Sequence, residues 1–180
     1  MNQLILVKYA AEIFLKGLNR GKFERKLLNN IKQKLEGLDY EIINDQNRWF
    51  IKADNIDEAV ERVRKVFGVA EVCIVTQVKR DLNIIKEEAL KKINEVKPKT
   101  FKVETNRANK KFTMNSLEVS RDVGGYILHH YEGDLDVQVK NPECVLNIEI
   151  REHAYIFTSA DKIKAVGGLP YGINGSTMLM

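Results

Sequence analysis

Residues 55–78 read NIDEAVERVRKVFGVAEVCIVTQV, a helix pattern followed directly by a strand pattern. Asn55 is a favourable N-cap, and Glu58 stands where it completes a capping box. The helical part has apolar residues three or four positions apart, namely Ile56, Ala59, Val60, Val63 and Phe67. Gly68 is expected to end this helix, and the β-branched residues of Val69–Val78 predict a strand.

The residues before this stretch supply one more helix and three more strands. Apolar residues recur every four positions in 19–35 and predict a helix. Strands are predicted for 3–9, 40–43 and 48–53, with a polar turn at 44–47. The order β-α-β-β-α-β is the ferredoxin-like pattern, in which two helices cover one face of an antiparallel sheet.

A second α+β unit begins near Arg80. Asp81 is expected to cap a helix that ends before Pro98, and a strand follows over 100–105. A polar, basic loop at 106–114 precedes a helix that Asn115 and Glu118 open as a capping box and that runs to about Tyr131. Short strands are expected at 136–139, 144–150 and 154–158, and the chain becomes linker-like from 161. The fold class is α+β.

The amino-acid composition indicates the class of protein and its cellular compartment. The 180 residues are 44% hydrophobic and 30% charged, which is typical of a globular protein. The longest apolar run is far shorter than the roughly 20 residues that span a bilayer, so no membrane partner is expected. Cys73 and Cys144 lie in strand-like segments and are expected to be buried, reduced thiols. These features favour a cytoplasmic protein.

The sequence does not predict a catalytic or metal site. The neighbouring His129 and His130 point about 100° apart on a helix, so they are not expected to bind one metal with His153. Glu132, Asp134 and Asp136 fit a solvated loop better than a cation site. No nucleophile elbow, dinucleotide fingerprint or Walker-type phosphate loop occurs.

Basic residues are concentrated although the net charge is only +4. Residues 97–111 contain six basic side chains and one acid, and the first helix presents a second cluster. Cations attract phosphates, amides can read base edges and an aromatic ring can stack on a base, so these segments predict a nucleic-acid surface. A solvated surface and, for Phe112 alone, a core position are the competing interpretations. The candidate residues are Lys16, Arg20, Lys22, Arg25, Lys26, Asn106, Arg107, Lys110, Lys111, Phe112 and Arg121.

Several segments together resemble one family. They are ILVKYAAEIFLKGLNRGKFERKLLNNI (5–31), FKVETNRANKKF (101–112), SLEVSRDVGGYI (116–127), VKNPECVLNIEIREHAYIF (139–157) and GGLPYG (167–172). The first resembles the N-terminal ferredoxin-like domain of the tRNA 4-thiouridine synthetases, or tRNA sulfurtransferases, which also belong to thiamine biosynthesis. The others resemble that family's THUMP domain and the linker after it. The resemblance implies a ferredoxin-like domain at 1–78 and a THUMP RNA-binding domain at 79–165. It also implies that 166–180 is a linker and the start of an ATP-pyrophosphatase domain that is otherwise missing.

The resemblance implies a tRNA-binding region that holds the acceptor end for a catalytic domain absent from this chain. In the family, that domain adenylates uridine 8 with ATP and magnesium, and a persulfide sulfur then displaces AMP. The chain is therefore expected to be inactive alone and to need no cofactor itself. A cysteine desulfurase as sulfur donor and a homodimer are further expectations, as is a role of the whole protein in making the thiamine thiazole.

The motifs also imply roles for single residues. RNA contacts are implied for Arg107, Lys110, Lys111 and Arg121, and a phosphate contact for Lys140, while Asn141 and Pro142 would shape the backbone. The family's Lys-Gly-x-Gly-Gly is here Lys164-Ala165-Val166-Gly167-Gly168, which lacks one glycine. Two alternatives stay open: a THUMP fragment of another RNA-modifying enzyme, such as a methyltransferase or pseudouridine synthase, and a ferredoxin-like ligand-binding or oligomerisation module.

Overall fold

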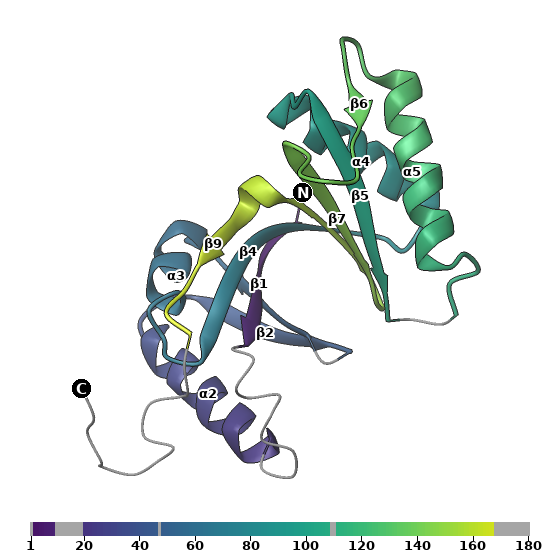
Figure 1. Cartoon of the computed structure of the whole chain (residues 1–180). Coiled ribbons are helices and arrows are strands. Elements are labelled where there is room, and N and C mark those ends of the chain that lie inside the picture. The colour runs from purple at the N-terminus through teal and green to yellow at the C-terminus, as the bar shows by residue number, and fades with distance from the viewer. Residues whose placement is uncertain (1, 10–19, 47, 109–110, 168–180) are drawn as a thin grey trace. The chain divides into compact units, whose positions relative to one another are not determined.

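The computed structural model describes residues 2–9, 20–46, 48–108 and 111–167 (Figure 1). Their contacts form two compact units. The described part of the first comprises residues 4–9, 20–44, 48–73 and 162–167. The second comprises residues 2–3, 45–46 and 74–161, apart from the two undescribed positions 109 and 110.

The first unit has the predicted β-α-β-β-α-β order. Its strands are β1 (Asn2–Tyr9) from Leu4 on, β2 (Tyr40–Asp45) as far as Asn44, β3 (Arg48–Ala53) and the first half of β4 (Val69–Val78), arranged β2-β3-β1-β4. The helices α2 (Arg20–Lys34) and α3 (Ile56–Val63) direct their apolar residues inward, and Phe23, Leu27, Ile31, Ala59, Val60 and Val63 are buried. Burial of these two stripes is the main force that fixes the helices on the sheet.

The second unit places two helices, α4 (Leu82–Val96) and α5 (Ser116–His130), on one face of its sheet (Figure 1). The sheet runs β4-β8-β7-β5-β6, with β5 (Thr100–Arg107), β6 (Asp136–Val137), β7 (Cys144–Ile150) and β8 (Ala154–Thr158). Strand β5 is parallel to both neighbours, whereas β7 and β8 form an antiparallel hairpin. The 3-10 helix η2 (Ser159–Asp161) follows β8.

Side-chain caps begin three of the helices as predicted. Asn55 accepts from the Glu58 amide, and Asp81 accepts from two amides at the start of α4. Asn115 and Glu118 form the complete, reciprocal capping box of α5. Each cap satisfies amides that have no partner within their own helix, which fixes where the helix begins.

Four local predictions are wrong. Strand β2 continues to Asp45, so Asn44 and Asp45 lie in the strand rather than in the predicted polar turn, and Asp45 is buried. Strand β5 continues through Arg107, because residues 101–107 pair in register with β7. Helix α3 ends at Val63, so Phe67 is exposed and Val66 is buried instead. The segment predicted to be linker-like contains β9 (Lys162–Lys164), which pairs with β4.

Both cysteines are free and buried, as expected. Burial raises the pKa of the Cys73 thiol to about 12, and it also raises the pKa of Cys144. Among the described residues, no helix has the length and apolar character needed to cross a membrane.

Candidate nucleic-acid interface

Helix α2 separates apolar and basic residues in the first unit. Phe23, Leu27 and Ile31 are buried, whereas Lys22 and Arg25 are exposed and Lys26 is half-buried. This arrangement follows from the four-residue spacing of the apolar positions, which leaves the cations on the remaining surface of the helix.

Two further candidates of this segment differ in their surroundings. The Arg20 guanidinium lies 2.6 Å from the Glu24 carboxylate, one turn further along α2, so an acid already partners this cation. Lys16 lies outside the described residues. The exposed cations of α2 are therefore the ones best placed to meet a polyanion.

Arg107 holds the loop between β5 and α5, residues 108–114, which we call the Arg107 loop. Its Nη1 donates to the carbonyl oxygens of Phe112 at 2.9 Å and Met114 at 3.2 Å. The Ala108 amide donates to the Ile150 carbonyl at 2.9 Å, which fixes the start of the same loop to the end of β7. Hydrogen bonds from a charged donor are stronger than neutral ones, so Arg107 shapes the loop's backbone.

The other candidates near this loop divide between core and surface. Phe112 packs in part against the apolar core between the helices and the sheet, which supports the core interpretation over a base platform. Asn106, Lys111 and Arg121 are exposed, the first at the end of β5 and the last on α5. Lys110 lies outside the described residues. Of the two exposed cations, Lys111 lies in the segment between Arg107 and Phe112, and Arg121 lies on α5.

Lys140 lies at the other end of the sheet. Because β7 runs parallel to β5 and pairs Phe101 with Cys144, residues before Cys144 lie beside the start of β5. With a rise of about 3.3 Å per residue, β5 separates Lys140 from the loop after Arg107 by roughly 20 Å. The structure therefore does not bring Lys140 together with the Arg107 loop.

The turn that carries Lys140 has a defined backbone. Gln138 Nε2 donates to the Lys140 carbonyl at 2.6 Å, and Asn141 has a φ of +51°. Asparagine is among the residues that best tolerate this left-handed conformation, which fits the backbone role that the resemblance implied. The Lys140 side chain remains exposed.

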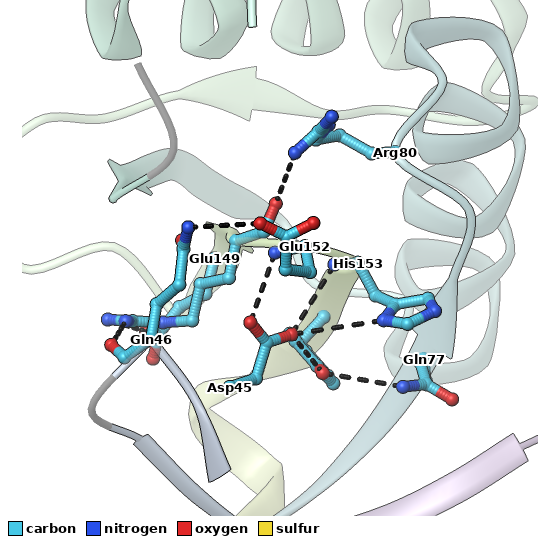
Figure 2. A network of polar contacts seen from close by, with 9 residues as sticks. Asp45, Gln46, Gln77, Arg80, Glu149, Glu152 and His153 are labelled. Atoms are coloured by element: carbon cyan, nitrogen blue, oxygen red, sulfur yellow. Dashed lines mark hydrogen bonds and ion pairs between the residues drawn. The ribbon is translucent and has the colours of Figure 1, made fainter. Parts of the chain in front are cut away.

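A buried network of charged and polar groups lies at the end of β7, where the sequence predicted only a hairpin turn (Figure 2). Arg151 is 6% exposed, and its Nη2 lies 3.1 Å from Oε1 of Glu149, which is also buried. The Asp45 carboxylate accepts from the Glu152 amide at 3.1 Å and from the Tyr155 hydroxyl at 2.6 Å. We call Asp45, Glu149, Arg151 and Tyr155 the buried network.

The buried network is extended by polar groups around it. Arg151 also donates to the Gln46 carbonyl, and Arg80 Nη1 donates to the Arg151 carbonyl at 3.0 Å. Gln77 donates to the Tyr155 hydroxyl at 3.3 Å. Burial, together with the Asp45 carboxylate, raises the pKa of Tyr155 well above its ordinary value, so its hydroxyl stays a donor. The network thus fixes the hairpin end of the sheet, next to the Arg107 loop.

Sequence reasoning missed these residues because their partners are distant. Asp45 and Tyr155 are 110 positions apart, and an aspartate after a strand is ordinarily read as part of a turn. His129 and His130 are both exposed. Among the described residues, no group of three or more His, Cys, Asp or Glu side chains could hold a metal ion.

Comparison with known proteins defines the class. The ThiI ferredoxin-like domain family matches residues 4–73, and the THUMP domain family matches residues 79–159. The chain is thus a THUMP protein with an N-terminal ferredoxin-like domain of the ThiI type, as its motifs predicted.

Similar sequences and structures narrow the class. The chain is 68% identical over 180 residues to the probable tRNA sulfurtransferase of Clostridium perfringens SM101, covering all of this chain and 47% of the relative. The protein PH1313 of Pyrococcus horikoshii matches with a TM-score of 0.79 and 34% identity, over 97% of this chain and 59% of that one. A 4-thiouridine synthetase solved as an RNA complex with bound ATP matches with a TM-score of 0.79 and 31% identity. The match covers 97% of this chain and 45% of the synthetase chain.

The chain is thus similar over its whole length to part of the probable tRNA sulfurtransferases, and its two domain families together account for most of its residues. It spans about half the length of the curated relatives that it matches.

Proposed function

We propose that this chain binds tRNA and holds its acceptor end for a sulfurtransferase that makes 4-thiouridine at position 8. The observation that carries the proposal is the 68% identity to a probable tRNA sulfurtransferase over the whole chain. The 31% identity to a synthetase solved with RNA supports the same assignment.

The exposed cations and amides of both units would make the RNA contacts. They are Lys22, Arg25 and Lys26 of α2, and Asn106, Lys111 and Arg121 around the Arg107 loop. Lys16, Lys110 and Lys140 remain predicted RNA contacts, because their positive charge would attract phosphates. Arg107 and Phe112 would act by holding the loop, since the guanidinium bonds two of its carbonyls and the ring packs on the core.

We infer that ATP and magnesium are bound by the catalytic domain of the whole protein rather than by this chain. The sequence has no Walker-type phosphate loop, and the described side chains include no cluster able to hold a metal ion. We assign the nucleotide chemistry to the part of the relatives that this chain does not span. The chain would contribute binding and orientation only.

The remaining expectations concern the whole protein. A cysteine desulfurase would supply the persulfide sulfur, and the same sulfur could serve thiamine thiazole synthesis in a cytoplasmic protein. A homodimer stays a prediction that sedimentation of the chain at micromolar concentration would test. These proposals rest on the family relationship.

Binding of unmodified tRNA by the 180-residue chain tests the proposal. We expect the affinity to fall steeply with salt, since each neutralised phosphate adds about 0.7–0.9 to the slope of log K against log salt concentration. A tRNA without its acceptor end should bind more weakly. A flat salt response, or equal affinity for the shortened tRNA, would contradict the proposal.

Charge reversal locates the contact in the second unit. Lys111→Glu should weaken tRNA binding, while Lys91→Glu, which makes the same change of charge at an exposed lysine on α4, is the matched control. Equal affinity of the two variants would remove the Arg107 loop from the interface.

A further inference from the structure

We propose that Phe67 is a stacking platform for an unpaired nucleotide, with Lys34 and Lys65 as its phosphate contacts. This site lies in the first unit, and the inference rests on the proposed function. It deepens that function by naming a contact that the sequence did not indicate.

Phe67 is 53% exposed although the apolar pattern placed it in the core. Helix α3 ends at Val63, and Val66 takes the inward position at 4% exposure. The backbone on both sides is held, because the Val66 amide donates to Val63 and the Gly68 amide donates to Gly167 at 2.7 Å. The fixed backbone thus holds the Phe67 ring in a position where it is exposed to solvent. The ring therefore contributes little to the core of the first unit.

The surroundings of Phe67 provide the groups that bind a nucleotide. A hollow of about 470 Å³ is lined by Phe67 and Val66, by the cations Lys34 and Lys65, and by Asn30, Gln33 and Glu36. Aromatic rings stack on bases, ammonium groups attract phosphates, and amides can bond base edges. The hollow combines all three kinds of group within one unit.

A neighbouring hollow strengthens the positive charge. About 340 Å³ in volume, it is lined by Arg64, Lys65 and Lys164 with Ala165 and Val166, so it shares Lys65 with the first hollow. Arg64 Nη1 lies 3.4 Å from Glu61, yet the described residues lining this hollow include three cations and no carboxylate. A phosphate backbone fits such a lining better than an apolar peptide does.

The site also continues the basic surface of α2. Lys22, Lys26 and Asn30 are four residues apart, and Gln33 follows after three, so these side chains share one side of the helix. A strand of RNA that meets Lys22 and Lys26 would reach the hollow at Phe67 by following α2. Continuity with the proposed interface is the reason to commit to RNA rather than to a protein segment.

Substitution of Phe67 separates stacking from simple apolar contact. Base stacking on an aromatic ring is worth about 1–3 kcal/mol, so Phe67→Ala and Phe67→Leu should each weaken tRNA binding by about 5-fold or more. Phe67→Trp should keep the affinity within about 3-fold. Its new indole should be quenched by tRNA, against the background of Trp49, the sole native tryptophan, which is 5% exposed.

The lysine arm tests the phosphate contact. Lys65→Glu should weaken binding and reduce the slope of log K against log salt by about 0.7 or more. Lys52→Glu, an exposed lysine on β3 outside both hollows, is the matched control and should change the affinity less. Circular dichroism and the unfolding midpoint confirm that each variant is folded.

The outcomes distinguish this inference from the proposed function. If the wild-type chain binds tRNA with a steep salt dependence but Phe67→Ala binds equally well, the site is wrong and the proposed function stands. If Phe67→Leu retains full affinity while Phe67→Ala loses it, an apolar contact replaces stacking and the inference is overturned. If the wild-type chain does not bind tRNA, both proposals fail.

Discussion

Arg151 and Arg25 carry the same charge in opposite surroundings. The Arg151 guanidinium is 6% exposed and bonds the Glu149 carboxylate and a backbone carbonyl, whereas Arg25 is exposed on α2. The first charge is matched inside the protein, so removing it should harm folding. The second faces solvent, so removing it should harm the binding of a polyanion and leave folding nearly unchanged.

The comparison shows why the net charge of +4 is a poor measure of an RNA surface. Buried cations such as Arg151 contribute to that sum but are already neutralised by a neighbour. The useful quantity is the positive charge that remains exposed on one surface, which here concentrates along α2 and around Lys65.

Arg151→Ala should give the largest loss of stability. It leaves the buried Glu149 carboxylate without its guanidinium partner, which typically costs about 3–5 kcal/mol. Urea unfolding would measure this loss. Arg25→Ala, the matched control, should change stability by no more than about 0.5 kcal/mol. Similar losses of stability in Arg151→Ala and Arg25→Ala would show that the buried and the exposed arginine contribute equally to folding, which would contradict the comparison.

Asp45→Ala should have the next largest effect. The Tyr155 hydroxyl and two backbone amides lose an acceptor, and a buried group left unpaired costs about 1–3 kcal/mol. Asp54→Ala, an exposed acid, is the control and should be nearly neutral. A neutral Asp45→Ala would mean that the buried network contributes little beyond the packing around it.

The sequence predicted the parts of this fold that depend on local pattern. The helix starts at Asn55, Asp81 and Asn115 follow from side chains that bond amides two or three residues away, and their patterns are visible in the sequence. The burial of Asp45 depends on Tyr155, which is far along the chain, and the exposure of Phe67 follows from the end of α3 at Val63, which the apolar pattern did not reveal. The basic character of the candidate interface was predictable, but its division into exposed contacts and the loop-holding Arg107 was not.

Arg107 is half-buried, so its exposure is intermediate between that of the buried Arg151 and that of the exposed Arg25. Arg107→Ala removes two hydrogen bonds to loop carbonyls, so it should reduce stability by about 1–2 kcal/mol and speed hydrogen exchange at residues 112–114. If it only positions the loop, tRNA affinity falls while the salt slope is unchanged. A slope smaller by about 0.7–0.9 would instead make Arg107 a direct phosphate contact.

Cys73 extends the comparison to a group that is neutral because it is buried. Burial raises the pKa of its thiol to about 12, and the neighbouring Glu71 carboxylate adds to this shift. The pKa is higher in the folded than in the unfolded chain, so the stability linked to this thiol is present below about pH 9 and is lost as the pH rises toward 12. At pH 8, iodoacetamide should therefore modify Cys73 much more slowly in the native chain than in guanidinium chloride, as followed by mass spectrometry of the Cys73 peptide. Equal rates of modification in the native and the denatured chain would contradict this prediction, because they would show that the Cys73 thiol is accessible and ionises freely in the folded protein.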